Sequence, residues 1–171
     1  MSRHLDSIRQ LLGKGPMTAR QIVEKTGLSQ PTVSRALAAL GDEIVRIGAG
    51  SAIRYALRDT ARGFASAPIF QVSDEGLIRE LGTLVPVRPH GFVMAQADGV
   101  PVHSDGLPWW LFDMRPQGYL GRAYASTYAA ALGLSSNPEH WSDTQVIQAL
   151  LAHGHEAIGN VLIGELARNR F

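Results

Sequence analysis

Apolar residues recur every three or four positions through the first third of the chain, a spacing that predicts amphipathic helices. The first series runs from Leu5 to Leu12 and ends at the glycine- and proline-containing stretch 13–16. Thr18 and Gln21 then have the spacing of a capping box, which predicts the start of a second short helix. Both helices would turn one apolar face towards a common core.

The stretch GLSQPTVSRALAAL, residues 27–40, predicts a third helix. Ser29 is a favourable N-cap, and the proline in the first turn is tolerated because the N–H that it lacks would have no partner there. Val33, Leu37 and Leu40 face one side of this helix, and the opening glycine suits a left-handed turn after the second helix. The second and third helices therefore have the order of a helix-turn-helix pair.

An alternation of apolar and polar residues replaces the helical spacing after the third helix. The stretch EIVRIGAGSAIRYAL, residues 43–57, reads as a strand, a glycine-rich turn and a second strand. Three helices followed by a hairpin is the order of a winged helix-turn-helix, which we predict for residues 1–60. Residues 61–68 contain few large apolar side chains and are predicted to form a linker.

Residues 69–171 are predicted to form a second, small domain in which strands come first and helices later, so that the fold class of the chain is α+β. The segments 69–73 and 84–105 are typical of strands, whereas 75–82 fits a helix or a strand equally well. Helices are expected at 122–132 and from 143 onwards, and a last short strand is expected within 158–164.

The composition is that of a globular protein, with 45% hydrophobic and 18% charged residues. The chain contains no cysteine, which excludes disulfides and thiolate zinc sites and favours a reducing compartment. No apolar run approaches the roughly 20 residues of a membrane helix, and the stretch MSRHLDSIRQ lacks the apolar core of a signal peptide. We therefore expect a cytoplasmic protein without a membrane partner.

The net charge of +1 conceals an uneven distribution. Residues 1–62 contain ten Lys/Arg against five Asp/Glu, whereas residues 63–171 contain six against ten. This division fits two domains with different partners, and the basic domain is the candidate for binding double-stranded DNA.

The outward side of the third helix carries side chains of the types that read the DNA major groove. Glutamine pairs with adenine, arginine with guanine, and serine or threonine with phosphates or a thymine methyl group. Residues of the hairpin would hold the flanking backbone or the minor groove. The candidate DNA-binding residues are Thr18, Ser29, Gln30, Thr32, Ser34, Arg35, Arg46, Ser51 and Arg54. The alternative is a solvated polar face, because winged-helix domains also bind proteins.

The stretch LSQPTVSRALAAL, residues 28–40, resembles the helix-turn-helix of bacterial regulators of the ArsR, MarR and IclR type. The resemblance implies the fold and suggests binding to an operator. Two half-sites one helical turn apart require two-fold symmetry, so we expect a homodimer.

The stretch GLPWWLFDMRPQGYLGRAYA, residues 106–125, contains two adjacent tryptophans. Alternate residues of a strand face opposite sides, so Trp109 and Trp110 cannot both point inward from one strand. One of them is expected in an interface or a pocket wall, and the alternative is that both pack around a turn. The candidate interface or pocket residues are Trp109, Trp110, Phe112 and Tyr119.

This stretch and IGNVLIGE, residues 158–165, resemble the N-terminal part of the HipA family of serine/threonine kinases, which are toxins of type II toxin–antitoxin systems. The HipA-like proteins of the YjjJ type are similar in placing a winged helix ahead of this region. In this family the phosphate-binding loop, the catalytic aspartate and the metal-binding residues lie later in the chain. The resemblance therefore implies a HipA-like N-terminal subdomain without the kinase core.

The residues agree with this expectation, and we predict no catalytic and no metal-binding residue. Residues 63–171 contain no lysine to hold ATP phosphates, and the chain has no G-x-x-x-x-G-K-[ST] loop. The stretch HGHE, residues 153–156, has no evident partner ligands, and we interpret it as part of a surface loop. His90 and His103 adjoin turn residues and are expected to be solvated. No cofactor is predicted, and ATP and magnesium would enter only with a kinase core.

The sequence therefore favours a transcriptional regulator, or the DNA-binding module of a HipA-like toxin–antitoxin kinase system that regulates its own operator. The expected partners are DNA, a second copy of the chain, and a kinase core or an antitoxin. We expect the chain to be the front part of a longer kinase-like protein or one component of a split system, and not an enzyme by itself. The alternatives are a regulator whose second domain binds a small molecule, and a fragment of an active kinase.

Overall fold

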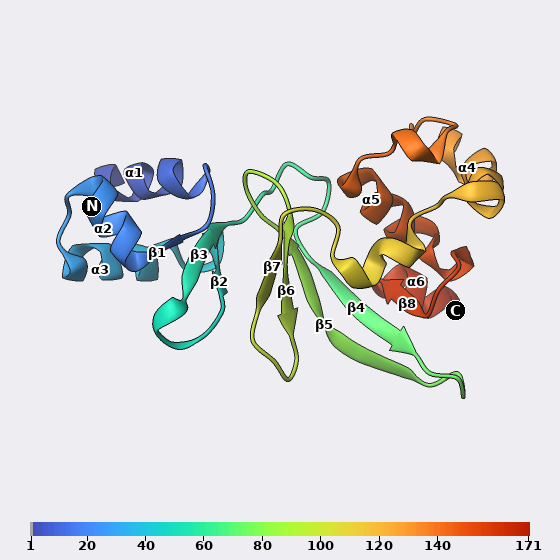
Figure 1. Cartoon of the computed structure of the whole chain (residues 1–171), viewed down its shortest axis with the longest axis horizontal. Coiled ribbons are helices and arrows are strands. Elements are labelled where there is room, and N and C mark those ends of the chain that lie inside the picture. The colour runs from blue at the N-terminus through green and yellow to red at the C-terminus, as the bar shows by residue number, and fades with distance from the viewer. Residues whose placement is uncertain (1) are drawn as a thin grey trace.

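The caps predicted for the N-terminal helices are present in the computed structural model, which describes residues 2–171 (Figure 1). The helices that open the chain are α1 (Ser2–Leu12), α2 (Ala19–Thr26) and α3 (Gln30–Leu40). Thr18 and Gln21 form the predicted capping box at the start of α2. Ser29 accepts a hydrogen bond from the backbone N–H of Thr32 and thereby caps α3.

The predicted hairpin follows α3. It consists of β2 (Ile44–Ile47) and β3 (Arg54–Leu57), which are antiparallel. The strand β1 (Met17–Thr18) pairs with β3 and completes a sheet of order β1-β3-β2. The sequence pattern does not predict β1, because a strand of two residues is too short to show alternation.

The helices and one face of this sheet enclose the first hydrophobic core. Ile8, Ile22 and Val33 are fully buried there, one from each helix, and Leu57 contributes from β3. Fully burying an apolar side chain of this size contributes about 1.5–3 kcal/mol relative to leaving it exposed. The buried residues are those that recur at helical spacing, so the pattern identifies the correct faces.

A second, antiparallel sheet has the strand order β7-β6-β5-β4-β8. Its strands are β4 (Ala67–Val72), β5 (Ile78–Pro86), β6 (Phe92–Gln96), β7 (Val102–Ser104) and β8 (Val161–Ile163). The segment 75–82, for which the pattern fits helix and strand equally, contributes to the long strand β5. The last short strand expected within 158–164 is present as β8, and it pairs with β4, so the end of the chain returns to the sheet.

Helices and short 3₁₀ turns follow β7 and pack on this sheet. They are η3 (Trp109–Met114), α4 (Gly118–Leu132), η4 (Pro138–His140), α5 (Asp143–His153), η5 (Gly154–Glu156) and α6 (Glu165–Arg170). Gly133, with φ of 68°, ends α4, and Ser142 and Gln145 form a capping box at the start of α5. Trp141 is 2% exposed and lies in the core between these elements and the sheet. Within residues 2–171, no helix is long and apolar enough to cross a membrane.

The hairpin lies between the N-terminal helices and the second sheet (Figure 1). Val45 and Ile47 of β2 form a small core with Val85 of β5 and Val93 of β6, on the hairpin face that points away from the helices. The turn of the hairpin is joined to the second sheet by a hydrogen bond of 2.9 Å from the Gly48 N–H to the carbonyl of Pro101. The two units therefore share an apolar interface.

The segment predicted as a linker, 61–68, carries contacts of its own. Arg62 donates hydrogen bonds to Asp59, to the carbonyl of Val87 at 2.7 Å and to the carbonyl of Gly91 at 3.0 Å. Its guanidinium also lies 5.2 Å from the ring centre of Phe92. The connection between the two units is therefore held against the β5–β6 turn by hydrogen bonds of Arg62.

Candidate nucleic-acid interface

The helix α3 has one buried and one exposed side. The buried side consists of Val33, Ala36, Leu37 and Leu40. Gln30, Ser34 and Arg35 are exposed on the other side, and Thr32 is half-buried. These four side chains are the ones that the sequence assigns to the major groove. In the free protein, the Arg35 Nε donates a hydrogen bond of 3.3 Å to the carbonyl of Pro31, so the guanidinium lies along the helix.

The hydroxyl groups near the start of α3 and of α2 take part in capping. The Ser29 Oγ and Thr32 Oγ1 atoms lie 2.8 Å apart, and Thr18 accepts a hydrogen bond from the backbone N–H of Gln21. A hydroxyl that caps a helix sits at its positive end, where an anion is also favoured. Ser29 is exposed, and Thr18 and Thr32 are half-buried. The helix caps fix the orientation of these hydroxyl groups in the free protein.

The structure places the three hairpin candidates differently. Arg46 is exposed, and its guanidinium lies 5.9 Å from the ring centre of Tyr55, its cross-strand partner. Ser51 is exposed in the turn between the strands. Arg54 is half-buried and pairs with Ile47, so it lies on the face that packs against the second sheet. Arg46 and Ser51 are thus more accessible to a polyanion than Arg54.

The adjacent tryptophans lie in the 3₁₀ turn η3 and not in a strand, so strict alternation does not apply to them. Trp109 is 79% exposed, whereas Trp110 packs against the core of the second unit. Phe112 and Tyr119 are also exposed. One tryptophan therefore faces outward, but it does so from a 3₁₀ turn and not from the strand on which the expectation was based.

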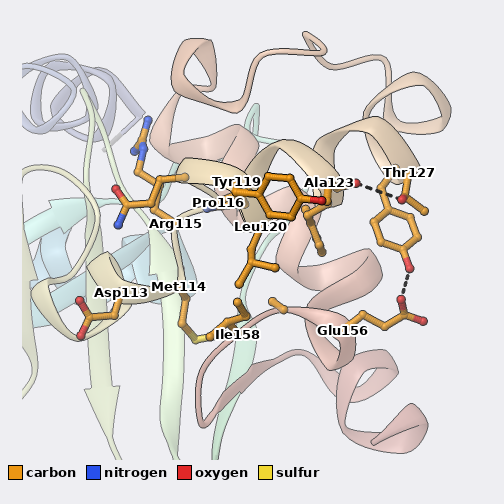
Figure 2. A pocket seen from close by; sticks show the side chains of 15 residues that line it. Asp113, Met114, Arg115, Pro116, Tyr119, Leu120, Ala123, Thr127, Glu156 and Ile158 are labelled. Carbon is orange, nitrogen blue, oxygen red and sulfur yellow. Dashed lines mark hydrogen bonds between the residues drawn. The ribbon is translucent and has the colours of Figure 1, made fainter.

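A pocket with a volume of about 560 Å³ lies beside the N-terminal half of α4 (Figure 2). Of the four predicted pocket residues, only Tyr119 lines it. Figure 2 shows Tyr119 and Leu120 on the α4 side of the pocket, with Met114 and Ile158 next to each other beneath them. Leu120 and Ile158 are large, apolar and exposed, a combination that the sequence does not distinguish from core residues.

The polar side of this pocket includes tyrosines and two carboxylates, Asp113 and Glu156. The Tyr128 hydroxyl donates a hydrogen bond to Glu156, and this bond raises the pKa of Tyr128. Burial, together with the charge of neighbouring Glu156, raises the pKa of Tyr124, whose hydroxyl donates a 3.2 Å hydrogen bond to the carbonyl of Ala149. Both tyrosines are therefore neutral donors, and Glu156 is the acidic group beside them.

The histidines do not form a metal site. Among residues 2–171, no group of three or more His, Cys, Asp or Glu side chains has the geometry to hold a metal ion. The ring of His153 stacks on Tyr128 with ring centres 4.0 Å apart. The expectation that His103 is solvated is wrong: its side chain is 9% exposed, because it lies on the strand face that the hairpin covers. Burial lowers the pKa of His103.

The fold and the exposed polar side of α3 define a helix-turn-helix protein with an attached α+β unit. Residues 7–43 match the family described as bacterial regulatory protein, arsR family, and residues 64–171 match the family described as YjjJ-like toxin, middle domain. The chain belongs to the family of YjjJ-like toxins.

A curated relative is Toxin YjjJ of Escherichia coli (strain K12), which is 36% identical to the chain over 162 residues. The alignment covers 94% of this chain but only 36% of the length of the relative. No solved structure matches the chain.

Proposed function

We propose that the chain is the DNA-binding part of a toxin–antitoxin system and binds its own operator through a winged helix-turn-helix. The observation that carries this proposal is the exposed polar side of α3, which stands opposite the buried residues that fix the helix in its unit. The match of residues 7–43 to a family of bacterial regulatory proteins supports it. The excess of Lys/Arg in residues 1–62 supplies the positive charge that a DNA backbone attracts.

Each candidate residue has a role that follows from its place. Gln30 and Arg35 project from the exposed side of α3 and read base edges. Ser34 and the capping hydroxyls contact phosphates near the positive helix ends. Arg46 and Ser51 of the hairpin contact the flanking DNA backbone. Arg54 is half-buried, so it attracts that backbone only through its charge and from a greater distance. The helix enters the major groove, and the chain binds a pseudo-palindrome as a homodimer.

The first test is a gel shift with a duplex that contains the promoter upstream of the gene. Arg35→Ala should cost about 1–3 kcal/mol of binding free energy and relax specificity at one base pair. Arg46→Ala should weaken binding to all sequences alike and lower the slope of log K against log salt by about one. Arg122→Ala, on the exposed side of α4, is the matched control. If the Arg35 and Arg46 variants both bind like the parent, the assigned face is wrong.

The second unit, in this proposal, contacts the catalytic core of a HipA-like serine/threonine kinase or an antitoxin. Its support is the match of residues 64–171 to the middle domain of YjjJ-like toxins, together with the exposed aromatic residues Trp109, Phe112 and Tyr119. ATP and magnesium would bind to that core and not to this chain. Kinase activity or ATP hydrolysis by the purified chain alone would contradict this assignment.

A second candidate function is favoured by the pocket beside α4. Its volume of about 560 Å³ falls in the range of small-molecule sites, and its wall combines apolar side chains with a few charged ones, Asp113, Arg115 and Glu156. In this case the chain is a regulator whose α+β domain binds a small molecule. A ligand-induced rise in melting temperature that Leu120→Asp abolishes would support this function, and an unchanged rise in that variant would argue against it.

A further inference from the structure

A second cleft lies where the helix-turn-helix unit meets the second sheet. It has a volume of about 710 Å³, and its walls come from the end of α1, the 3₁₀ turn η1 (Gly41–Glu43), the chain at and after the end of β3, and the β5–β6 turn. The cleft is therefore large enough for a small ligand, and it is bounded by both units.

Some of the charged side chains that line this cleft form ion pairs, whereas others do not. Arg9 donates hydrogen bonds to both carboxylate oxygens of Glu43, at 2.7 and 2.9 Å, and a third to Asp6. Arg88 is 3.8 Å from a carboxylate oxygen of Asp59. Lys14 and Arg58 also line the cleft, and neither forms an ion pair within residues 2–171.

The acidic residues do not cancel this excess. Glu43 is already occupied by Arg9, and Asp59 is shared between Arg88 and Arg62, the latter at 2.9 Å. Asp42 is exposed at the rim. The cleft therefore keeps a net positive charge.

Arg58 is the most constrained of these cations. Its backbone N–H donates to the carbonyl of Glu43 at 2.9 Å, and it forms a β-bridge with Val87, so its backbone is fixed. Its Nε is buried and has no hydrogen-bond partner among the described residues. A half-buried guanidinium without a partner is unfavourable, and an oxyanion would supply both charge and acceptors, because the guanidinium fork matches phosphate geometry.

We propose that this cleft binds a small oxyanion of the phosphate class, with Arg58 and Lys14 as its main cationic contacts. Gln10 and Thr60, which also line the cleft, supply neutral donors. The ligand is a free anion and not the DNA backbone. In Figure 1 the exposed helix α3 lies along the lower side of its unit, whereas α1, whose end lines the cleft, lies along the upper side.

The position of the cleft gives the anion a structural effect. Lys14 follows α1, which packs against α3 in the first core, whereas Arg58 and Arg88 belong to the junction with the second sheet. A bound oxyanion joins these cations across the junction and stabilises the arrangement of the two units. The folded protein therefore gains stability with ligand concentration.

The test is calorimetric titration and thermal unfolding of the full chain with sodium phosphate, with sodium chloride keeping the ionic strength constant. Phosphate should bind saturably and raise the melting temperature, and chloride should not. Arg58→Gln and Lys14→Gln should each weaken phosphate binding about tenfold, because each removes a charge-assisted contact. Arg122→Gln, an exposed residue of α4, should bind phosphate like the parent.

Lys14→Gln keeps the test decisive if Arg58→Gln does not fold, because Lys14 is exposed in a turn. A third arm repeats the titration with saturating duplex DNA. Unchanged phosphate affinity supports a separate site for a free anion, whereas competition by the duplex would place the cleft on the DNA-binding surface and overturn the proposal. The absence of saturable binding, or equal binding by the parent and Lys14→Gln, would also overturn it.

Discussion

Replacement of Arg62 by methionine tests whether the connection between the two units is a structural element. The Arg62 side chain is 11% exposed, and its partner Asp59 is 13% exposed. Methionine keeps most of the apolar volume over Phe92 but removes the charge and all the donors. The variant leaves a buried carboxylate and two carbonyls, those of Val87 and Gly91, without this partner.

The expected loss of stability can be worked from these contacts. Removing one partner of a buried, hydrogen-bonded ion pair costs about 3–5 kcal/mol, chiefly because the remaining charge stays desolvated. Arg88 lies 3.8 Å from the other oxygen of Asp59 and partly compensates for the loss. We therefore expect Arg62→Met to lower the free energy of unfolding by about 3 kcal/mol, the lower end of that range.

Urea unfolding followed by tryptophan fluorescence and circular dichroism measures this loss. Arg122→Met, at an exposed position of α4, serves as the control and should change stability by less than about 0.5 kcal/mol. Asp59→Asn and the double variant complete a cycle that isolates the coupling between Arg62 and Asp59. A loss below about 1 kcal/mol in Arg62→Met, or no coupling in the cycle, would refute the reasoning.

Substitutions at four further positions have expected outcomes. Gly82→Ala should prevent folding or cost more than about 2 kcal/mol in urea unfolding, because φ is +151° and the new Cβ would lie 2.3 Å from the carbonyl oxygen of Ala95. Ser29→Ala should cost about 1 kcal/mol through the loss of the α3 cap, and Ser34→Ala on the exposed side should be neutral by the same measurement. Burial lowers the pKa of His103, so the unfolded chain binds that proton more tightly and stability should fall as the pH drops below about 6.5. His103→Gln should flatten this pH dependence, and an unchanged profile would assign it to other groups.

Local signals in the sequence predict much of the helix-turn-helix unit. The capping box of Thr18 and Gln21 and the N-cap Ser29 act within one helical turn, so their effect can be read from spacing alone. The apolar series of each helix likewise reports the face that is buried. The two residues of β1 escape prediction because their pairing with β3 depends on where the chain returns, and not on their own pattern.

The candidate sites also differ in whether the sequence alone predicts them. The exposed side of α3 is the complement of its buried side, so the positions of Gln30 and Arg35 on it follow from the sequence. The pocket beside α4 does not follow from the sequence, because Tyr119 and Glu156 line the same pocket only through the packing of segments that are distant in the chain. The 3₁₀ geometry around Trp109 also lies beyond a pattern argument, since a short turn has neither the period of a helix nor that of a strand.

The hairpin shows how one short element fixes the relation between the two units. Tyr55 and Leu57 pack against the N-terminal helices, whereas Val45 and Ile47 pack against the second sheet. A strand pair with apolar residues on both faces must be covered on both faces, and this is the sequence signal of the junction. Separation of the units would expose the second of these faces to water, so the hydrophobic effect favours the arrangement in which the two units are packed together. The relation between the helix-turn-helix and the α+β unit therefore rests on packed apolar side chains as well as on the hydrogen bonds of Arg62.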